Sequence, residues 1–418
     1  MSQKIKISVI GLGYVGLPLA LEFSNKFLTV GFDINNRRIK SLNDNKDFNN
    51  EISKEDLKKH KNIIFTNNEN QLKGSDFFII TVPTPVKKNF KPDLDPIFSA
   101  NKIISKYIKE KSIIIYESTV FPGCTENIFA KDLEKLTNLK LNKNFFVGYS
   151  PERINPGDQK HQIKNIVKLV SGSTYMSLKK IENIYSKIIN KIEIVESIKV
   201  AEAAKVIENT QRDVNVALMN ELYQIFEKDN LDFRKILKAA NTKWNFLNFN
   251  PGFVGGHCIS IDPYYLIDYS NRLKAKSKII TNSRKLNENF YKLPINNIKR
   301  FNKLKNKKLT ILVCGLAFKD NVSDIRNSQA LRIIRSLNNL GHNVFTYDPL
   351  AQKDFSKNLD INYISLPNKK LFDVVLILRN HKIFKNKKSI IINSKKKSGI
   401  FLDYSNGFLD KTYCYASF

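Results

Sequence analysis

The sequence predicts an α/β protein in which two doubly wound parallel-sheet domains are joined by one long central helix. Three observations carry this prediction: a strand that enters a glycine-rich turn near residue 10, an uninterrupted helical pattern over residues 196–229, and a second strand and turn near residue 314. Short apolar strands separated by helices are typical of parallel sheets. We place the domain boundaries at residues 1–195, 196–300 and 301–418.

The first domain begins with an apolar strand at residues 5–10, a turn at Gly11–Gly16, a helical pattern over Leu17–Phe23 and a second strand at Leu28–Asp33. This β–turn–α–β order is the start of a Rossmann-like sheet. Further buried strands are expected at residues 77–82, 113–117 and 145–149.

The turn between the first strand and helix predicts a dinucleotide site. Gly11, Gly13 and Gly16 fit the spacing that allows a tight turn, close approach of a pyrophosphate and close helix packing. Asp33 follows about 20 residues later, where a carboxylate can receive the ribose 2′-hydroxyl. Its charge would repel a 2′-phosphate, so we expect NAD rather than NADP as cofactor. FAD is the remaining alternative, because flavoproteins use the same glycine pattern.

The long helix has two distinct faces. At about 100° per residue, Lys205, Asn209 and Arg212 share a polar face. An apolar stripe lies opposite, made of residues spaced near multiples of about 3.6: Val200, Ala204, Ile207, Val214, Leu218, Leu222 and Ile225.

After a helical or loop-rich segment that reaches about residue 300, the pattern returns to strands. Residues 308–314 form an apolar strand followed by Gly315, and further strands are expected at residues 343–347, 374–378 and 400–402. Together they predict the smaller second α/β domain.

The four cysteines, Cys124, Cys258, Cys314 and Cys414, form no CxxC pair, so we expect neither a zinc site nor a disulfide framework, and no bound metal. Cys258 stands out because Gly255 and Gly256 leave room for a substrate to approach its thiol. Asp262 lies four residues later and would face Cys258 on a helical turn. Cys124 has no evident acid or base partner, and Cys314 lies within an apolar strand.

Composition limits the remaining classes. A hydrophobic fraction of 42% over 418 residues suffices for buried cores, and no apolar run is long enough to span a membrane. The strand pattern starts so close to Met1 that we expect no signal peptide and a cytoplasmic protein. The net charge of +30 raises nucleic-acid binding as an alternative, but the lysines are dispersed along the chain, so we predict no nucleic-acid partner.

Several motifs resemble the UDP-glucose/GDP-mannose dehydrogenase family, in its bacterial branch of UDP-N-acetylhexosamine 6-dehydrogenases. They occur in family order over nearly the whole chain. These motifs are residues 11–18, 81–85, 117–120, 150–157, 201–205, 209–213, 243–246, 255–258 and 315–319.

The resemblance implies a four-electron oxidation. Two NAD molecules would in turn accept hydrides from C6 of the sugar, and Cys258 would hold the aldehyde as a thiohemiacetal and then a thioester before hydrolysis. Lys205 and Asp262 would handle protons and oxyanion charge, with Asn209 helping to hold the oxyanion. Thr119 and Glu152 would position the hydrolytic water.

The resemblance also assigns binding residues and domain roles: an NAD-binding domain, a central helical dimerisation domain and a UDP-sugar-binding domain. The residues expected at the cofactor are Gly11, Gly13, Tyr14, Val15, Gly16, Asp33, Arg38, Thr81, Pro83, Thr84 and Thr119. Those expected at the substrate are Glu152, Arg153, Lys205, Asn209, Arg212, Phe253, Gly256, Arg284 and Lys319. A homodimer or higher homo-oligomer built on the long helix is expected.

Two departures from the family pattern lie near the end of the chain. Arg379 stands where relatives have a small apolar residue, and residues 403–407 lack the usual basic residue beside Asp403. UDP-GlcNAc and UDP-GalNAc are the favoured substrates, with UDP-ManNAc and UDP-glucose as alternatives. A two-electron dehydrogenase of the hydroxyacid type is a further alternative, but that class needs no nucleophilic cysteine.

Overall fold

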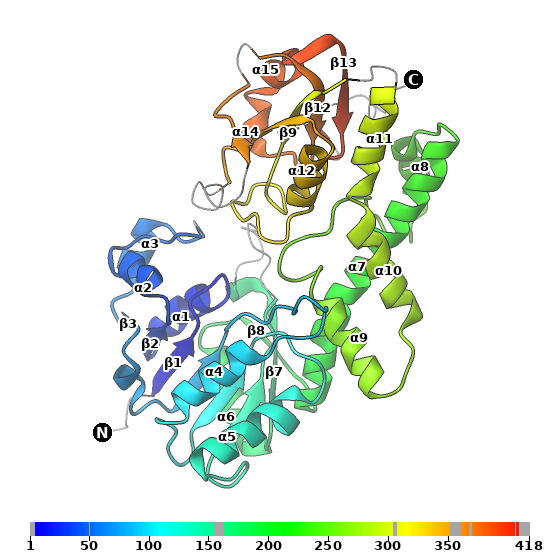
Figure 1. Cartoon of the computed structure of the whole chain (residues 1–418). Coiled ribbons are helices and arrows are strands. Elements are labelled where there is room, and N and C mark those ends of the chain that lie inside the picture. Colours follow the sequence, from blue (N-terminus) through cyan, green and yellow to red (C-terminus); the bar gives the residue numbers. More distant parts are fainter. Residues whose placement is uncertain are drawn as a thin grey trace. The chain divides into compact units, whose positions relative to one another are not determined.

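The computed structural model describes residues 5–49, 51–153, 163–303, 307–351, 361–367, 370–405 and 407–408 (Figure 1). The chain forms two compact units. The first comprises residues 1–208 and 264–275, and the second comprises residues 209–263 and 276–418.

The first unit is built on a sheet of eight strands in the order β3-β2-β1-β4-β5-β6-β7-β8. The strands are β1 (Lys6–Ile10), β2 (Leu28–Phe32), β3 (Ile63–Thr66), β4 (Phe77–Ile80), β5 (Ile113–Tyr116), β6 (Phe146–Tyr149), β7 (Val167–Gly172) and β8 (Lys191–Ile194). All neighbouring strands are parallel except β6 and β7. The parallel doubly wound prediction is thus confirmed, with one antiparallel pairing that the pattern did not reveal.

Helices join these strands as the crossovers of a parallel sheet require. They are α1 (Gly16–Ser24), α2 (Asn36–Asn43), α3 (Lys54–Lys59), η1 (Glu69–Leu72), α4 (Asp95–Ile104), the π-helical turn η2 (Thr125–Phe129), α5 (Ala130–Thr137), η3 (Ile163–Asn165) and α6 (Tyr175–Ser186). The apolar residues of β1, β4 and β5 pack with α1 and α6 into one buried core. This core makes the carboxyl ends of the strands a rigid support for the loops that follow them.

The long helix is present as α7 (Ile198–Lys228), within two residues of the predicted bounds. In a simple amphipathic helix the apolar face is buried and the polar face is exposed, but several residues of α7 show the reverse. Lys205 and Asn209 are buried, whereas Val200, Ile207, Leu218 and Ile225 of the apolar stripe are 43–54% exposed. Four of the seven stripe residues are therefore exposed, whereas Ala204, Val214 and Leu222 are half-buried and Leu222 packs against the core of the second unit.

The second unit carries helices α8 (Phe233–Ala240), α10 (Lys278–Asn289) and α11 (Lys292–Lys303) before its sheet. Helix α9 (Asp262–Arg272) starts in this unit and belongs to the first unit from Tyr264 onward. The sheet has five parallel strands in the order β11-β10-β9-β12-β13. These are β9 (Thr310–Cys314), β10 (Asn343–Tyr347), β11 (Asn362–Tyr363), β12 (Phe372–Ile377) and β13 (Lys395–Asp403). The predicted second α/β domain is confirmed.

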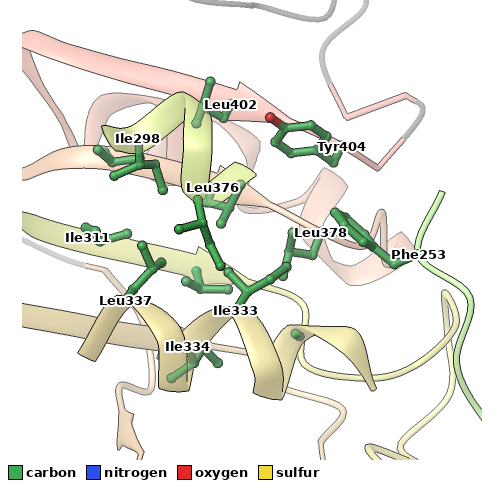
Figure 2. Packing of buried hydrophobic residues seen from close by; sticks show 14 of the residues in the cluster. Phe253, Ile298, Ile311, Ile333, Ile334, Leu337, Leu376, Leu378, Leu402 and Tyr404 are labelled. Atoms are coloured by element: carbon green, nitrogen blue, oxygen red, sulfur yellow. The ribbon is translucent and has the colours of Figure 1, made fainter. Parts of the chain in front are cut away.

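Helices α12 (Gln329–Asn339), α14 (Lys382–Lys385) and α15 (Lys388–Asn393) accompany this sheet. Figure 2 shows Ile333 and Leu337 of α12 facing the strand residues Ile311 and Leu376 in one buried cluster. Phe253, from the loop before Cys258, belongs to the same cluster. The chain segment that carries Cys258 is thereby anchored in the core of the second unit. Among the described residues, no helix is both long and apolar enough to cross a membrane.

Candidate active site

The glycine turn after β1 has the geometry of a dinucleotide-binding turn. Gly11 has a φ of +96°, which favours glycine, and a Cβ at Gly16 would lie 1.8 Å from the Gly11 carbonyl oxygen. A Cβ at Gly13 would meet nothing within 4 Å. Two glycines are thus required by the protein's own packing, while the third borders open space. Tyr14 and Val15 complete the turn, and Val15 is the N-cap of α1.

Asp33 and Arg38 hold this turn from the side of β2. The Asp33 carboxylate accepts hydrogen bonds from the backbone N–H of Leu12 at 2.8 Å and of Asn35 at 2.8 Å. Arg38 Nε donates to the Leu12 carbonyl at 2.8 Å, and Nη1 pairs with buried Asp47 at 2.6 Å. Asp33 therefore lies beside the turn as expected, whereas Arg38 is engaged with the turn's backbone and Asp47.

The loops after β4 and β5 follow two neighbouring strands, and β4 also lies next to β1. Thr81 Oγ1 donates to the Gly11 carbonyl at 2.7 Å, and Ser118 Oγ donates to the Val82 carbonyl at 2.6 Å. These bonds connect the glycine turn, the segment with Pro83 and Thr84, and the segment with Thr119. Ligands of open α/β sheets bind at such carboxyl ends of strands.

Glu152 follows β6 and is buried, and Lys205 Nζ donates to its backbone carbonyl at 2.6 Å. The neighbouring Arg153 forms an ion pair with Glu208 of α7 and donates to the Val167 carbonyl at 3.1 Å. The structure thus brings Glu152 and Lys205 together. The predicted contact of Arg153 with substrate stays a prediction, as does the role of residues 154–157 of the same motif, which lie outside the described residues.

Cys258 lies on an exposed turn that leads into α9. The Asp262 N–H donates to the Cys258 carbonyl at 2.8 Å, so the two residues are one helical turn apart. Asp262 is buried, and its carboxylate accepts a hydrogen bond of 2.5 Å from Asn209 Nδ2. Three of the predicted catalytic residues therefore belong to one local arrangement in the second unit.

The other described cysteines are in a different environment. Burial raises the pKa of the Cys124 thiol, and burial also raises the pKa of Cys314 well above its ordinary value. A thiolate is the reactive form of cysteine, and both sites disfavour it. Of the cysteines that the structure describes, Cys258 is the one exposed to solvent.

The loop that carries Cys258 is fastened to the second α/β domain. Asn327 Nδ2 donates to the Gly256 carbonyl at 3.1 Å, and Gln329 Nε2 donates to the Val254 carbonyl at 3.2 Å. A Cβ at Gly256 would lie 2.6 Å from the ring of Phe318. Phe318 directly precedes the predicted substrate residue Lys319 in the sequence. A Cβ at Gly255 would likewise lie 2.8 Å from the Asn327 carbonyl oxygen. The sequence suggested that these two glycines leave room for a substrate, whereas in the structure they permit close packing of the Cys258 loop against Phe318 and Asn327.

Arg379, the departure from the family pattern, also connects the Cys258 loop to the second α/β domain. Its Nε donates to the Ala317 carbonyl at 3.0 Å and its Nη2 donates to the Phe253 carbonyl at 3.2 Å. Burial lowers the pKa of Arg379 to about 10. The hydrogen bonds of this arginine go to backbone carbonyls of the protein, so its observed role is to hold two loops together.

Asp348 and His381, which were not predicted as functional residues, support the Lys319 loop. Both are fully buried, and Asp348 accepts hydrogen bonds from the N–H groups of Leu316 and Ala317 at 2.7 and 3.1 Å. His381 Nδ1 accepts from the Asn321 N–H at 2.8 Å, so its Nε2 donates toward Asp348 at 3.2 Å. The signal was present: a glycine after the first strand and an aspartate after the second repeat the pattern of the first domain.

Two arginines predicted at the substrate are placed differently from each other. Arg284 is fully buried, and its two Nη atoms pair with Asp213 at 2.5 Å and Glu288 at 2.6 Å. Arg212 is exposed. Their substrate contacts stay predictions. Within the described ranges, no group of three or more His, Cys, Asp and Glu residues could hold a metal ion.

Comparison with known proteins identifies similar sequences over nearly the whole chain. Three profiles of the UDP-glucose/GDP-mannose dehydrogenase family match: the NAD binding domain at residues 5–189, the central domain at residues 199–289 and the UDP binding domain at residues 312–410.

Individual relatives agree with these profiles. The chain is 47% identical to Protein CapL of Staphylococcus aureus over 402 residues, covering 95% of each chain. It is 41% identical to UDP-N-acetyl-D-glucosamine 6-dehydrogenase of Salmonella typhi over 388 residues, covering 92% of this chain and 91% of that protein. Among solved structures it is similar to UDP-D-ManNAc dehydrogenase of Pyrococcus horikoshii, with a TM-score of 0.89, 30% identity and coverage of 99% and 98%.

Proposed function

Because this chain belongs to the UDP-glucose/GDP-mannose dehydrogenase family, we propose that it oxidises the C6 hydroxyl of a UDP-N-acetylhexosamine to the uronic acid through a covalent intermediate on Cys258. The chain is an NAD-dependent nucleotide sugar dehydrogenase. The observation that carries the covalent route is the exposed thiol of Cys258, one helical turn from a buried Asp262 that is bonded to Asn209.

The first unit fits NAD. The space beside Gly13 would admit a pyrophosphate to the backbone, and the N-terminus of α1 supplies partial positive charge. The Asp33 carboxylate lies at the end of β2, where a ribose hydroxyl would be expected. Bound NAD supplies the hydride acceptor, once for each of the two oxidations.

The covalent route accounts for four electrons without release of an aldehyde. The alcohol loses a hydride and a proton to become an aldehyde. The Cys258 sulfur then forms a bond to the aldehyde carbon, and the aldehyde oxygen takes up a proton in place of the one the thiol loses. Loss of a second hydride from carbon, together with the hydroxyl proton, converts the resulting thiohemiacetal to a thioester. Water then adds to the thioester carbon, the carbon–sulfur bond breaks, and the products are the uronate, the free thiol and one proton.

Each predicted residue has a part in this scheme. Asn209 and Asp262 would steady the charge that develops on the substrate oxygen next to Cys258, and Lys205 would move the proton of the alcohol. Thr119 and Glu152 would orient the hydrolytic water. The hydrogen bond of Asn209 to Asp262 and that of Lys205 to the Glu152 carbonyl support these roles, since both keep polar side chains ordered in buried positions.

Among UDP-N-acetylhexosamines we favour the glucosamine compound. The relative named for it is 41% identical to this chain, whereas the solved relative named for the mannosamine compound is 30% identical. UDP-GalNAc remains in the same class, because it differs from UDP-GlcNAc at a single stereocentre.

A panel of UDP-sugars tests the proposal. With UDP-GlcNAc, UDP-GalNAc, UDP-ManNAc and UDP-glucose offered separately, we expect two NADH per sugar consumed, measured by absorbance, and the highest kcat/KM for UDP-GlcNAc. Cys258→Ser should bind NAD normally but lose production of the uronate. One NADH per sugar, together with a fully active serine variant, would refute the covalent route.

Trapping the intermediate is a second, independent test. In Glu152→Gln the hydrolytic water loses its carboxylate, so we expect the thioester to accumulate. Mass spectrometry of the intact protein after mixing with NAD and sugar nucleotide should find an adduct, and peptide mapping should place it on Cys258. Slow turnover with no adduct would argue against covalent catalysis.

We also propose a homodimer formed through the exposed apolar stripe of α7. Val200, Ile207, Leu218 and Ile225 lie within about 20° of one line along the helix, at about 100° per residue. Such a row of exposed apolar side chains is typical of an interaction surface. Light scattering should give twice the monomer mass for the natural chain and the monomer mass for Leu218→Glu. A monomeric natural chain at micromolar concentration would refute the dimer.

A further inference from the structure

Beneath the loops that carry Thr119 and Glu152 lies a buried ion pair that the proposed chemistry does not use. Lys168 of β7 and Glu117, directly after β5, are 2.6 Å apart, and their side chains are 1% and 0% exposed. The hydroxyl of Tyr185 in α6 donates to the other oxygen of Glu117. A buried ion pair is seldom an efficient source of stability, because both charges lose their hydration. A role other than stabilising the fold therefore explains this buried pair better.

The contacts of Lys168 supply one. Besides pairing with Glu117, the ammonium donates to the backbone carbonyl of Pro151 at 3.1 Å. Pro151 directly precedes Glu152, and Glu117 stands two residues before Thr119. One ammonium group thus bridges the segment that follows β5 and the segment that follows β6.

The ammonium group of Lys205 also binds the backbone at Glu152. Lys205 Nζ donates to the Glu152 carbonyl at 2.6 Å, so two consecutive carbonyls, of Pro151 and Glu152, each accept from a lysine. Burial raises the pKa of the Glu117 carboxyl, Lys168 opposes the rise, and nearby Glu152 adds to it. Glu117 and Glu152 are thus close enough to influence each other, and Lys168 offsets the negative charge between their segments.

We propose that Lys168, with Glu117 as its counter-charge, is a positioning residue for hydrolysis of the Cys258 thioester. The inference rests on the proposed function. In that step a water oxygen bonds to the thioester carbon, the carbon–sulfur bond breaks, and the sulfur leaves with one of the two water protons while the other is released with the uronate. Thr119 and Glu152 must contact the same water, and Lys168 fixes their separation. The hydride transfers do not use this water.

The test removes both charges together, so that neither is left buried alone. In Lys168→Met/Glu117→Gln we expect a normal burst of two NADH per active site, followed by turnover at least about tenfold slower than in the natural chain, because displacement of reacting groups by about 1 Å can cost a hundredfold. Intact-protein mass spectrometry should find the Cys258 adduct accumulated. The value of kcat/KM for the UDP-sugar should be unchanged, because kcat and KM fall together when only a step after formation of the adduct slows. The deficit should shrink toward pH 9, where hydroxide replaces the positioned water.

The matched control is Lys179→Met/Glu182→Gln, the same pair of substitutions at an exposed ion pair of α6. It should behave as the natural chain does. Tyr185→Phe is a milder second variant that removes only the hydroxyl group that donates to Glu117. If the buried double variant does not melt cooperatively, Tyr185→Phe tests the proposal in its place. We then expect the rate of thioester hydrolysis to fall about threefold while the burst of NADH is unchanged.

Equal slowing of the burst and of turnover, without accumulated adduct, would overturn the positioning role, as would natural turnover in the variants. These outcomes differ from failure of the proposed function itself. That failure would appear in the natural chain, as one NADH per sugar or as full activity of Cys258→Ser.

Discussion

In the glycine turn after β1, a single added methyl group should affect either the stability of the protein or its binding of NAD, depending on which glycine is replaced. In Gly13→Ala the added Cβ meets no atom within 4 Å, and no positive φ opposes it. The folded protein should therefore accept the change, and its free energy of unfolding should be unchanged or higher by up to about 1 kcal/mol, since alanine restricts the unfolded chain. The same methyl would occupy the space through which a pyrophosphate approaches the backbone.

Gly16→Ala should have the opposite signature. Its Cβ would lie 1.8 Å from the Gly11 carbonyl oxygen and 2.4 Å from Thr81 Oγ1. The first of these atoms is backbone and cannot rotate away, so the turn itself must shift. Overpacking typically costs about 1–3 kcal/mol, and we expect the upper end of that range or more.

Urea unfolding and NAD titration followed by NADH fluorescence displacement measure the two effects. Gly13→Ala should keep the natural unfolding midpoint but bind NAD at least about tenfold more weakly, a loss of about 1.4 kcal/mol. Gly16→Ala should lower the midpoint. Gly252→Ala, whose Cβ also meets nothing within 4 Å, is the control and should alter neither. Natural NAD affinity in Gly13→Ala would refute the assignment of the turn to the pyrophosphate.

Three further predictions use other parts of the chain. Brief iodoacetamide labelling of the native protein, read by peptide mapping, should modify Cys258 before Cys124 and Cys314, whose pKa values are raised by burial; the reverse order would contradict the assignment of the reactive thiol. Arg379→Met should lower stability by about 1–3 kcal/mol in urea, because backbone carbonyls lose their donors, and a neutral effect would show that these bonds are dispensable. Burial raises the pKa of Glu202 to about 7, so its contribution to stability is present below its ordinary pKa and is lost as the pH rises through about 7. Glu202→Gln should flatten the change of stability between pH 5 and 8 by an amount on the order of 3 kcal/mol, and parallel pH curves for the two proteins would contradict this.

The long helix illustrates where prediction from sequence reached its limit. Its length is a local property, because no glycine or proline interrupts residues 196–229, and α7 ends within two residues of both predicted bounds. The periodicity also separated a polar face from an apolar stripe. Periodicity cannot say which face a neighbour will cover, and in the structure Lys205 and Asn209 are covered while Ile207 and Leu218 are exposed.

The two lysines near Glu152 show the same limit. Lys205 could be singled out because its helix and its motif are visible in the sequence. Lys168 could not, since its meaning depends on Glu117, Pro151 and Tyr185, which come from three other segments of the chain. One lysine among many in a chain of net charge +30 carries no local signal of burial.

The sequence by itself determined the fold class and the glycine turn with Asp33. Each of these depends on backbone geometry within a few residues, or on spacings along a single strand or helix. Only the tertiary structure decided which thiols are buried, which face of α7 is exposed, and which charges are paired. Burial and pairing depend on contacts between residues distant in sequence, and such contacts form only when the sheets and helices pack.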